Sequence, residues 1–519
     1  MTNVAQQSQT LDPSCLAEWF RRRAIRAPER PAVTFKNQTV SYGQMQAEIE
    51  LLSGVFHEQG VKQGDRVGFL ASNHPMNLIA QFAVARIGAI LVPLNYRLAT
   101  TELVAILKDA DVSVLLVDPE HARKFDVKIR DVLGCQAYFC FGQECEGWLQ
   151  LEPLMDRVST LPPAADAAPD DAVALMYTSG TTGDAKGVML SSRNIWTNNL
   201  NWILTSDFTS LDVTLNCAPL FHVGGLCVVL LPTLMSGGHL ILQEAFDPQQ
   251  YLDDIERYQV TVSFAVPAMM LFASQHSSFG TRDFSSMRLI VAGGAPVPEP
   301  LLKTYRQRGV PVSQCYGMTE ATSGVAFLET ERAETKLGSC GRAGPLNEVK
   351  LIDESGRTID SPAVPGEICV RGGNVTPGYW RRPDLTAEAL DAEGWYRTGD
   401  GAYFDDEGFY YICDRLKDMI ISGGENIYPA EIESLLYAHP AIAEVAIIGR
   451  EDVKWGERVL AVVVLKPDAS LTLQEAVDFL EPSVARYKLP KELHLLDAMP
   501  RNSNGKILKT ELRKIFSVT

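Results

Sequence analysis

The chain has 519 residues, which is too many for one hydrophobic core and predicts at least two domains. Hydrophobic residues make up 46% of the sequence and charged residues 21%, which is typical of a globular enzyme and excludes disordered and fibrous classes. The 64 acidic side chains against 47 basic ones argue against a nucleic-acid partner, which normally requires a basic surface. A locally positive site for ATP remains compatible with this balance.

The N-terminal residues 1–7 are polar and lack the apolar core of a signal peptide. The best apolar run, residues 226–235, is too short to span a bilayer and contains Pro232. We therefore expect a cytoplasmic protein without an integral membrane segment.

Ten cysteines are scattered along the sequence. The closest trio, Cys135, Cys140 and Cys145, has neither C-x-x-C spacing nor nearby histidines. Reduced thiols are expected here rather than a zinc site or a disulfide framework.

Strands and helices alternate from Pro31 to about Thr160, which predicts α/β layering. Apolar residues recur at helical spacing between Met45 and Phe56, residues 65–70 form an expected strand, and residues 75–86 form an expected helix opened by a proline. Residues 161–170 are typical of a linker. A second α/β stretch runs to about Glu329, with strands expected around Leu240, Val262 and Leu289.

Short β runs punctuated by Gly and Pro predict a small barrel-like subdomain between Gly338 and Cys413. After Asp414 the pattern predicts a compact α+β tail. Its expected elements are a helix over 429–438, strands over 445–448 and 459–465, and helices near Leu473 and Leu508. The fold class is therefore α/β, with an N-terminal domain over 1–414, a hinge over 415–418 and a smaller mobile domain over 419–519.

A strand-like run, residues 172–177, leads directly into a loop of small hydroxyl residues, glycines and one lysine. Such a loop shapes the backbone to wrap phosphate. A Walker P-loop is excluded, because it requires glycine where Ala185 stands and a hydroxyl where Gly187 stands, so a P-loop kinase or ATPase is disfavoured. The alternative is a flexible surface turn. The predicted nucleotide-binding residues are Thr178, Ser179, Gly180, Thr181, Thr182, Gly183 and Lys186.

The loop closely resembles the phosphate-binding signature of the adenylate-forming superfamily, which includes acyl- and aryl-CoA synthetases, peptide-synthetase adenylation domains and firefly-type luciferases. Further boxes of that superfamily follow in order at 316–320, 396–400 and 500–506, so the resemblance covers nearly the whole chain. It implies that a carboxylate attacks the α-phosphate of ATP, expels pyrophosphate and becomes an acyl adenylate. Asp184-Ala185 and Cys413 depart from the usual pattern, and Asp184 adds an acid to a phosphate loop.

The resemblance also implies roles for residues of the nucleotide site. Tyr316 stacks on adenine, Thr319 bonds the α-phosphate, and Glu320 coordinates Mg²⁺ together with Thr178. Asp400 accepts from the ribose hydroxyls, and Arg415 reaches the ribose or phosphates. Taken singly, each charge is more often a surface ion pair. The remaining residues placed at the adenine site are Gly294, Ala295 and Gly317.

The same resemblance divides the catalytic work between two parts of the C-terminal segment. Lys506 holds the carboxylate and α-phosphate during adenylation, Lys417 is the hinge, and the loop of Gly423, Gly424 and Glu425 enters the site for thioester formation. The alternative for Lys506 is an inert surface lysine.

His222 is the histidine that the resemblance places at the acid substrate. We assign it a positioning role in catalysis rather than that of a general base, although a lone histidine is more often structural. The predicted acyl pocket comprises Phe221, Val223, Gly224, Val266 and Met318. The pocket offers no obvious cation for a second carboxylate, so a fatty acid is favoured and an aryl acid stays open.

The sequence therefore predicts an ATP-dependent acid:CoA ligase with ATP, Mg²⁺ and CoA as cofactors and co-substrate. The alternatives are an enzyme that loads a carrier-protein pantetheine, a luciferase-like oxygenase, and a non-catalytic ligase-like binding protein. A non-catalytic relative is expected to lose Lys506, Glu320 or the phosphate loop, and this chain keeps them. A homodimer stays open.

Overall fold

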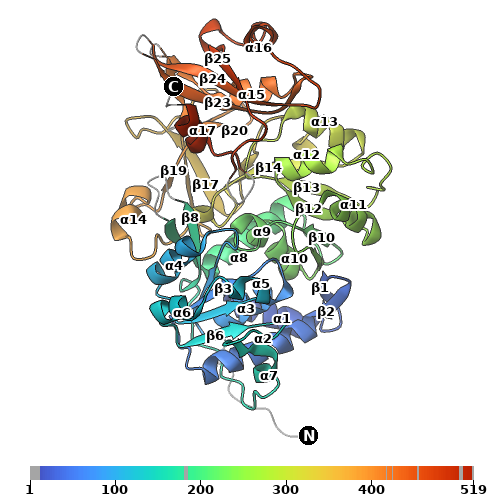
Figure 1. The fold of residues 1–519 in the computed structure, drawn as a ribbon, viewed down its shortest axis with the longest axis vertical. Helices are drawn as coiled ribbons and strands as arrows, with labels where there is room; N and C mark the ends of the chain where they lie inside the picture. Colours follow the sequence, from blue (N-terminus) through green and yellow to red (C-terminus); the bar gives the residue numbers. More distant parts are fainter. Residues whose placement is uncertain are drawn as a thin grey trace.

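The computed structural model describes residues 12–179, 185–415, 418–422, 425–452, 455–501 and 506–516. Figure 1 shows the sheets following one another along the long axis, with β6 near one end and β24 near the other. Helices cover the faces of the two largest sheets (Figure 1). The predicted α/β fold, with a large N-terminal part and a smaller C-terminal part, is confirmed.

One sheet has seven strands in the order β7-β6-β5-β3-β4-β8-β9, and β9 is antiparallel to its neighbour while the other pairs are parallel. Its strands are β3 (Arg66–Leu70), β4 (Ile90–Pro93), β5 (Val114–Val117), β6 (Ala137–Cys140), β7 (Leu149–Gln150), β8 (Ala172–Ser179) and β9 (Ala185–Ser191). The helices of this part are α2 (Tyr42–Glu58), α3 (Pro75–Arg86), α4 (Thr100–Asp109), α5 (Pro119–Ala122), α6 (Val127–Leu133) and α7 (Leu151–Met155). The expected strand at 65–70 and helix at 75–86 are therefore confirmed.

The second large sheet has nine strands in the order β16-β15-β14-β13-β12-β10-β11-β1-β2. Its strands are β1 (Pro31–Phe35), β2 (Gln38–Ser41), β10 (Val213–Asn216), β11 (His239–Leu242), β12 (Val262–Ala265), β13 (Leu289–Ala292), β14 (Val312–Tyr316), β15 (Ala326–Phe327) and β16 (Arg342–Ala343). The helices around it are α1 (Leu16–Arg26), α8 (Ser192–Ser206), α9 (Val223–Cys227), α10 (Leu230–Ser236), α11 (Pro248–Arg257), α12 (Pro267–Gln275), α13 (Glu299–Gln307), η1 (Thr319–Ala321) and η2 (Thr330–Arg332). The chain crosses between the two sheets, because β1 and β2 lie in the nine-stranded sheet, β3 to β9 form the seven-stranded sheet, and β10 to β16 return to the nine-stranded one.

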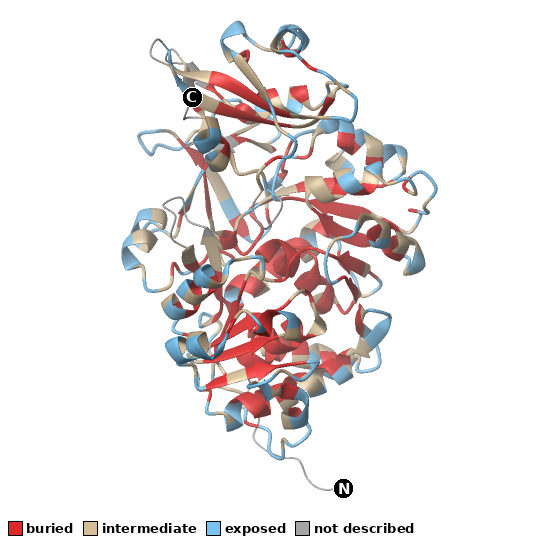
Figure 2. Cartoon of the chain, viewed as in Figure 1, coloured by how far each residue is buried: buried red, intermediate tan, exposed pale blue. Residues whose placement is uncertain are grey.

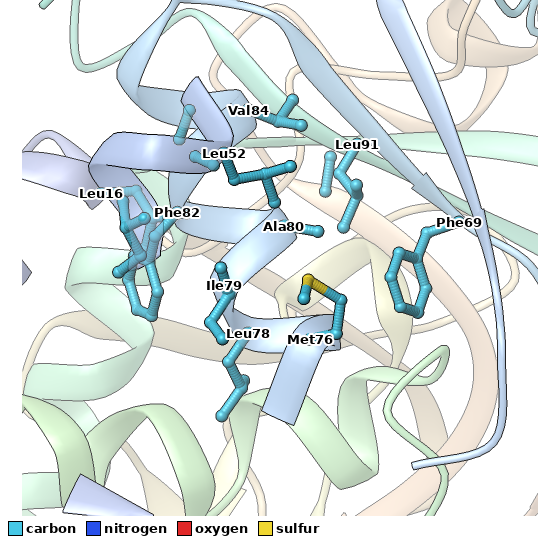
Figure 3. Close-up of a cluster of buried hydrophobic side chains, with 14 of the residues drawn as sticks. Leu16, Leu52, Phe69, Met76, Leu78, Ile79, Ala80, Phe82, Val84 and Leu91 are labelled. Atoms are coloured by element: carbon cyan, nitrogen blue, oxygen red, sulfur yellow. The ribbon is translucent and has the colours of Figure 1, made fainter. Parts of the chain in front are cut away.

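Helix α3 lies at the centre of the largest hydrophobic cluster (Figure 3). Pro75 occupies its first turn, His74 caps it, and every side chain from Met76 to Ala85 is buried. A helix that is apolar all round is stable only inside a core, and Figure 2 shows buried residues concentrated on this helix and on the adjoining strands. Among the described residues, no helix has both the length and the apolar character that a membrane crossing needs.

Two smaller sheets complete the fold. A four-stranded antiparallel sheet occupies the region in which a barrel-like subdomain was expected, and it comprises β17 (Asn347–Ile352), β18 (Gly366–Gly372), β19 (Tyr396–Phe404) and β20 (Tyr410–Arg415), with α14 (Pro383–Ala389) beside it. The C-terminal sheet comprises β21 (Ile420–Ser422), β22 (Glu425–Ile427), β23 (Ile442–Asp452), β24 (Gly456–Leu465) and β25 (Glu492–Leu495). Its helices are α15 (Pro429–Leu436), α16 (Leu473–Leu480), η4 (Arg486–Lys488) and α17 (Lys509–Phe516). The α+β character expected after Asp414 is confirmed.

Candidate active site

The predicted phosphate loop is the tip of a β-hairpin. Strands β8 and β9 pair antiparallel, with Thr178 opposite Lys186 and Ser179 opposite Ala185. The tip itself, Gly180 to Gly183 with Asp184, lies outside the described residues. The Lys186 ammonium lies over the ring of Tyr379, 5.4 Å from its centroid. Strand β9 of the hairpin therefore contacts the segment that follows β18.

The same tyrosine orients the predicted magnesium ligand. The Tyr379 hydroxyl donates to Glu320 Oε1 at 2.9 Å and lies 2.9 Å from the Tyr396 hydroxyl. Burial and the neighbouring Glu320 charge raise the pKa of both phenols, so both remain protonated donors at neutral pH. Lys186 and Glu320, which are far apart in the sequence, therefore meet around one buried tyrosine.

A second contact joins the predicted adenine and ribose residues. Tyr316 ends β14, and its hydroxyl donates to Asp400 Oδ2 at 2.6 Å. Burial, with the Asp400 charge, raises the pKa of Tyr316, which stays protonated. Arg415 is the backbone partner of Asp400 in the β19–β20 ladder, so the two predicted ribose residues lie side by side on neighbouring strands.

Strand β19 supports both of these contacts. It carries Tyr396 and Asp400, four residues apart, with an irregular pairing to β18 and the positive φ of Gly399 between them. Tyr396 lies beside the Glu320–Tyr379 pair, and Asp400 bonds Tyr316. The predicted metal residue and the predicted ribose residue are thus held next to each other by one strand.

Two of the predicted acyl-pocket residues, Gly224 and Val266, lie near the ring of Phe264 in β12. A Cβ added at Gly224 would lie 3.3 Å from that ring, and one added at Gly293 would lie 2.7 Å from Cys315 Sγ and 3.6 Å from the ring. Val266 lies within reach of a Cβ at Gly294, at 3.5 Å. Glycine is required at this close approach, because any side chain would occupy the space beside Phe264.

Phe221 and Met318 are both partly buried. The Phe221 ring meets the Tyr96 ring edge to face, with 5.4 Å between centroids, and Met318 packs partly buried beside Tyr316. Val223 is buried at the start of α9, whereas Gly294, Ala295 and Gly317 are exposed. The predicted acyl residues therefore lie among apolar side chains, while the predicted adenine-site residues Gly294, Ala295 and Gly317 lie at the surface.

His222 caps helix α9 and is fixed in one tautomer. Its Nδ1 accepts from the Gly224 backbone N–H at 3.0 Å, so the ring proton of the neutral form sits on Nε2. Burial lowers the pKa of His222 to about 4. The neutral ring can donate from Nε2 to a carboxylate but gains no proton near neutral pH, which supports the predicted positioning role rather than a general base.

Burial of His222 is also expected to make folding stability depend on pH. Between its ordinary pKa of 6.5 and the folded value of about 4, the unfolded chain binds a proton that the folded chain does not. The contribution is therefore intact above about pH 6.5 and falls on acidification towards 4, by up to about 1.4 kcal/mol per pH unit. Urea unfolding of wild type and His222→Gln across this range should show a shallower pH slope in the variant, and equal slopes would contradict the assignment.

Several of the predicted C-terminal residues lie outside the described residues. Lys506 is exposed, next to the bridge between Arg501 and Ile507. Strands β21 and β22 form a hairpin whose ends, Ser422 and Glu425, are paired, and its tip of Gly423 and Gly424 lies outside the described residues, as does the hinge Lys417. For Ser179, Arg415 and Glu425 the structure describes the backbone alone.

Two site residues were missed by the sequence reasoning. Tyr379 lies in the segment Gly378-Tyr379-Trp380, which belongs to none of the boxes. Tyr396 is the first residue of the box at 396–400, and the resemblance gives it no role. An aromatic residue that follows a glycine between two predicted strands was the available signal, but its partner Glu320 is 59 residues away.

Comparison with known proteins places this site in a family. Residues 20–380 match the description AMP-binding enzyme, and residues 431–506 match the AMP-binding enzyme C-terminal domain. The chain belongs to the AMP-binding enzyme family. The predicted superfamily resemblance is therefore confirmed, and the match spans the hairpin, Glu320 and Tyr379.

Curated relatives of this AMP-binding enzyme are similar over nearly their whole length. A feruloyl-CoA synthase from Amycolatopsis sp is 41% identical over 503 residues, which cover 96% of this chain and 99% of the relative. An indoleacetate–CoA ligase from Aromatoleum aromaticum is 39% identical, with 97% and 98% covered. Among solved structures, the o-succinylbenzoate CoA synthetase of Bacillus subtilis with its acyl-adenylate intermediate has a TM-score of 0.84 and 34% identity, covering 95% of this chain and 97% of that one.

Proposed function

We propose that this AMP-binding enzyme is an ATP-dependent acid:CoA ligase, which forms an acyl adenylate and pyrophosphate and then transfers the acyl group to CoA. The observation that carries the proposal is the contact of Lys186 and Glu320 with Tyr379, and of Asp400 with Tyr316, with Tyr396 joining the two on the strand that carries Asp400. The relatives named above, which are CoA synthases and ligases, support the same reaction. The chain is accordingly an acid–thiol ligase of the AMP-forming type.

The donor set around Glu320 fits Mg²⁺. A carboxylate held by a neutral phenol keeps lone pairs for a hard cation, and Thr178 on β8 offers a hydroxyl near the same hairpin. We assign Glu320 and Thr178 to the ion, which would neutralise phosphate charge. The B. subtilis synthetase has also been solved with ATP and a magnesium ion.

The other residues of the site are assigned to the nucleotide and the acid. Tyr316 would stack on adenine while its hydroxyl holds Asp400 for the ribose diol, and Lys186 would place positive charge at the phosphates. His222 Nε2–H would orient the substrate carboxylate towards the α-phosphate. We assign Thr319, which is buried in η1, to the α-phosphate.

Lys506 and the β21–β22 hairpin are proposed to act in turn. We retain the division at 1–414, 415–418 and 419–519, with the last segment rotating about Lys417 so that Lys506 serves adenylation and Gly423, Gly424 and Glu425 serve the thioester step. The exposed position of Lys506 supports a movement before adenylation. An ion pair of 2.7 Å between Asp418 and Arg513 joins the last residue of the hinge to α17.

We infer that the acid is a compact aryl or arylalkanoic acid. Behind Phe264, the buried cluster continues with Trp202 and Phe327, whose rings meet edge to face at 4.6 Å. Such packing limits the depth of the pocket on that side and suits a flat ring better than a long alkyl chain. Two of the relatives carry the aryl acids feruloyl and indoleacetate in their names. A fatty acid, which the sequence favoured, is the second candidate, since a long-chain-fatty-acid–CoA ligase is 37% identical.

Gly224→Ala should test the acid pocket directly. The new Cβ would lie 3.3 Å from the Phe264 ring and 3.0 Å from His222 Nδ1, so it narrows the pocket without touching the nucleotide residues. We expect the KM for an aryl acid to rise about tenfold, the effect of roughly 1.4 kcal/mol of lost binding, with the KM for ATP unchanged. Gly280→Ala, where a Cβ meets open space, is the matched control. An equal rise of both KM values would contradict this pocket.

The acceptor is tested by product analysis. The protein is incubated with ATP, Mg²⁺ and a panel of aryl and fatty acids, with either CoA or a holo carrier protein, and the thioesters are identified by mass spectrometry. Acyl-CoA from one acid class supports the proposal, loading of the carrier protein alone would replace CoA as acceptor, and no thioester with any acid would overturn it. We also propose a homodimer, which size-exclusion chromatography would test, and a cytoplasmic location, which cell fractionation would test.

A further inference from the structure

Two of the ten cysteines lie side by side at one edge of the seven-stranded sheet. Cys140 is the last residue of β6, and Cys145 lies in the loop that leads to β7. Their Sγ atoms are 2.8 Å apart, and both are free thiols. The pair lies at the opposite end of the sheet from the β8–β9 hairpin (Figure 1).

The chain on both sides of the pair is held in place. Cys140 is the ladder partner of Val117 in β5 and of Gln150 in β7. The Gly142 N–H donates to Glu152 Oε1 at 2.6 Å, and the Phe141 ring stacks on the Phe69 ring. The position of Cys140 is therefore set by ordered backbone, and on the other side the Cys145 carbonyl accepts from the Trp148 N–H at 3.1 Å.

The two thiols differ in their access to solvent. Cys140 is fully buried, whereas Cys145 is partly exposed. Burial, together with the hydrogen bond to Cys145, raises the pKa of the Cys140 thiol. An oxidant in solution therefore reaches Cys145 first, whereas Cys140 is shielded from solvent and stays a protonated thiol.

We propose that Cys140 and Cys145 are an oxidation site, at which a peroxide converts the two neighbouring thiols into a reversible disulfide. The proposal is independent of the ligase reaction. It assigns Cys145 as the sulfur that reacts with the oxidant and Cys140 as the resolving sulfur.

The chemistry balances in two steps. The Cys145 thiolate attacks one oxygen of hydrogen peroxide; the S–O bond forms, the O–O bond breaks, and the departing hydroxide takes the thiol proton as water. Cys140 sulfur then attacks the sulfenic sulfur of Cys145; the S–S bond forms, the S–O bond breaks, and the Cys140 proton leaves with the hydroxide as a second water. Two thiols lose two electrons, and one peroxide is reduced to two waters.

Cys135 provides a matched control within the same segment. It is partly buried, and its thiol donates to the Val112 carbonyl at 3.3 Å. Cys135 precedes the start of β6, whereas Cys140 is the last residue of that strand. Arg130 and Arg157 bound one tryptic peptide, residues 131–157, which contains all three cysteines. One peptide mass therefore reports which thiols remain free.

The test treats the full-length protein with hydrogen peroxide, blocks free thiols with iodoacetamide in denaturant, and measures this peptide. In wild type and in Cys135→Ser we expect Cys140 and Cys145 to escape alkylation after peroxide, and the peptide to be two hydrogens lighter than its dithiol form at these two residues. Reduction with dithiothreitol before alkylation should make both thiols alkylatable again. In Cys145→Ser we expect Cys140 to stay fully alkylated. Both variants should fold and keep wild-type ligase turnover when reduced.

Three outcomes with the folded protein would overturn the proposal. All thiols could stay alkylatable after peroxide, the bridge could involve Cys135, or Cys145 could reach sulfinic acid while Cys140 stays a free thiol. A bridge that also forms in denatured protein at the same rate would show that the fold does not bring the pair together. That result would overturn it as well.

Discussion

Lys506→Ala is expected to lower the rate of acyl-adenylate formation about a hundredfold to a thousandfold, the usual effect of removing one preorganised donor at a developing charge. The lysine is exposed in this structure, and we propose that its segment moves to bring it to the α-phosphate. Because its proposed role ends when the adenylate forms, the variant should still convert added acyl adenylate and CoA to thioester at a rate within about twofold of wild type. Pyrophosphate release and thioester formation are measured separately.

Lys514→Ala, on exposed α17 of the same segment, is the control for a change of lysine to alanine. It should leave both half-reactions intact. If Lys506→Ala lowered both half-reactions equally, the division of work between two positions of the C-terminal segment would be wrong.

Glu320→Gln is expected to have the second largest effect. The substitution keeps the shape and a hydrogen bond to Tyr379 but removes the charge that we assign to Mg²⁺, and adenylation should fall by about a hundredfold, with a higher Mg²⁺ concentration needed for half-maximal rate. Tyr379→Phe removes the donor that orients this carboxylate and should weaken Mg²⁺ dependence more mildly, by about tenfold. The measurement is the rate of pyrophosphate release against Mg²⁺ concentration.

Glu354→Gln, an exposed acid in the loop after β17, controls for a general loss of negative charge. It should leave the Mg²⁺ curve unchanged. A Glu320→Gln curve with wild-type midpoint and reduced plateau would assign Glu320 to catalysis without the metal, against our account.

Much of the local structure follows from short-range signals. Helix α3 begins at Pro75 and ends at Arg86, as its opening proline and apolar run predict, and β3 matches its expected residues almost fully. The crossing of the chain between the two large sheets was not predictable, because β1 pairs with β11 across some two hundred residues. Strand order depends on such distant pairings, and sequence periodicity carries no information about them.

The candidate site shows the same division. Resemblance supplied Glu320, Asp400 and Lys186 by their boxes, but their mutual arrangement rests on the contacts of Tyr379, Tyr396 and Tyr316. The fixed tautomer of His222 also required the structure, since it depends on a single backbone N–H from Gly224. Motifs therefore predicted the chemistry, while the contacts that orient each group came from the fold.

In the proposed reaction, an acyl adenylate forms before CoA takes part. The most direct test is the acid-dependent exchange of labelled pyrophosphate into ATP with no CoA present. We predict exchange with those acids that later yield a thioester, and none without acid or Mg²⁺. Thioester formation without any such exchange, or exchange that requires CoA, would contradict the two-step account and the roles assigned to Glu320 and Lys506.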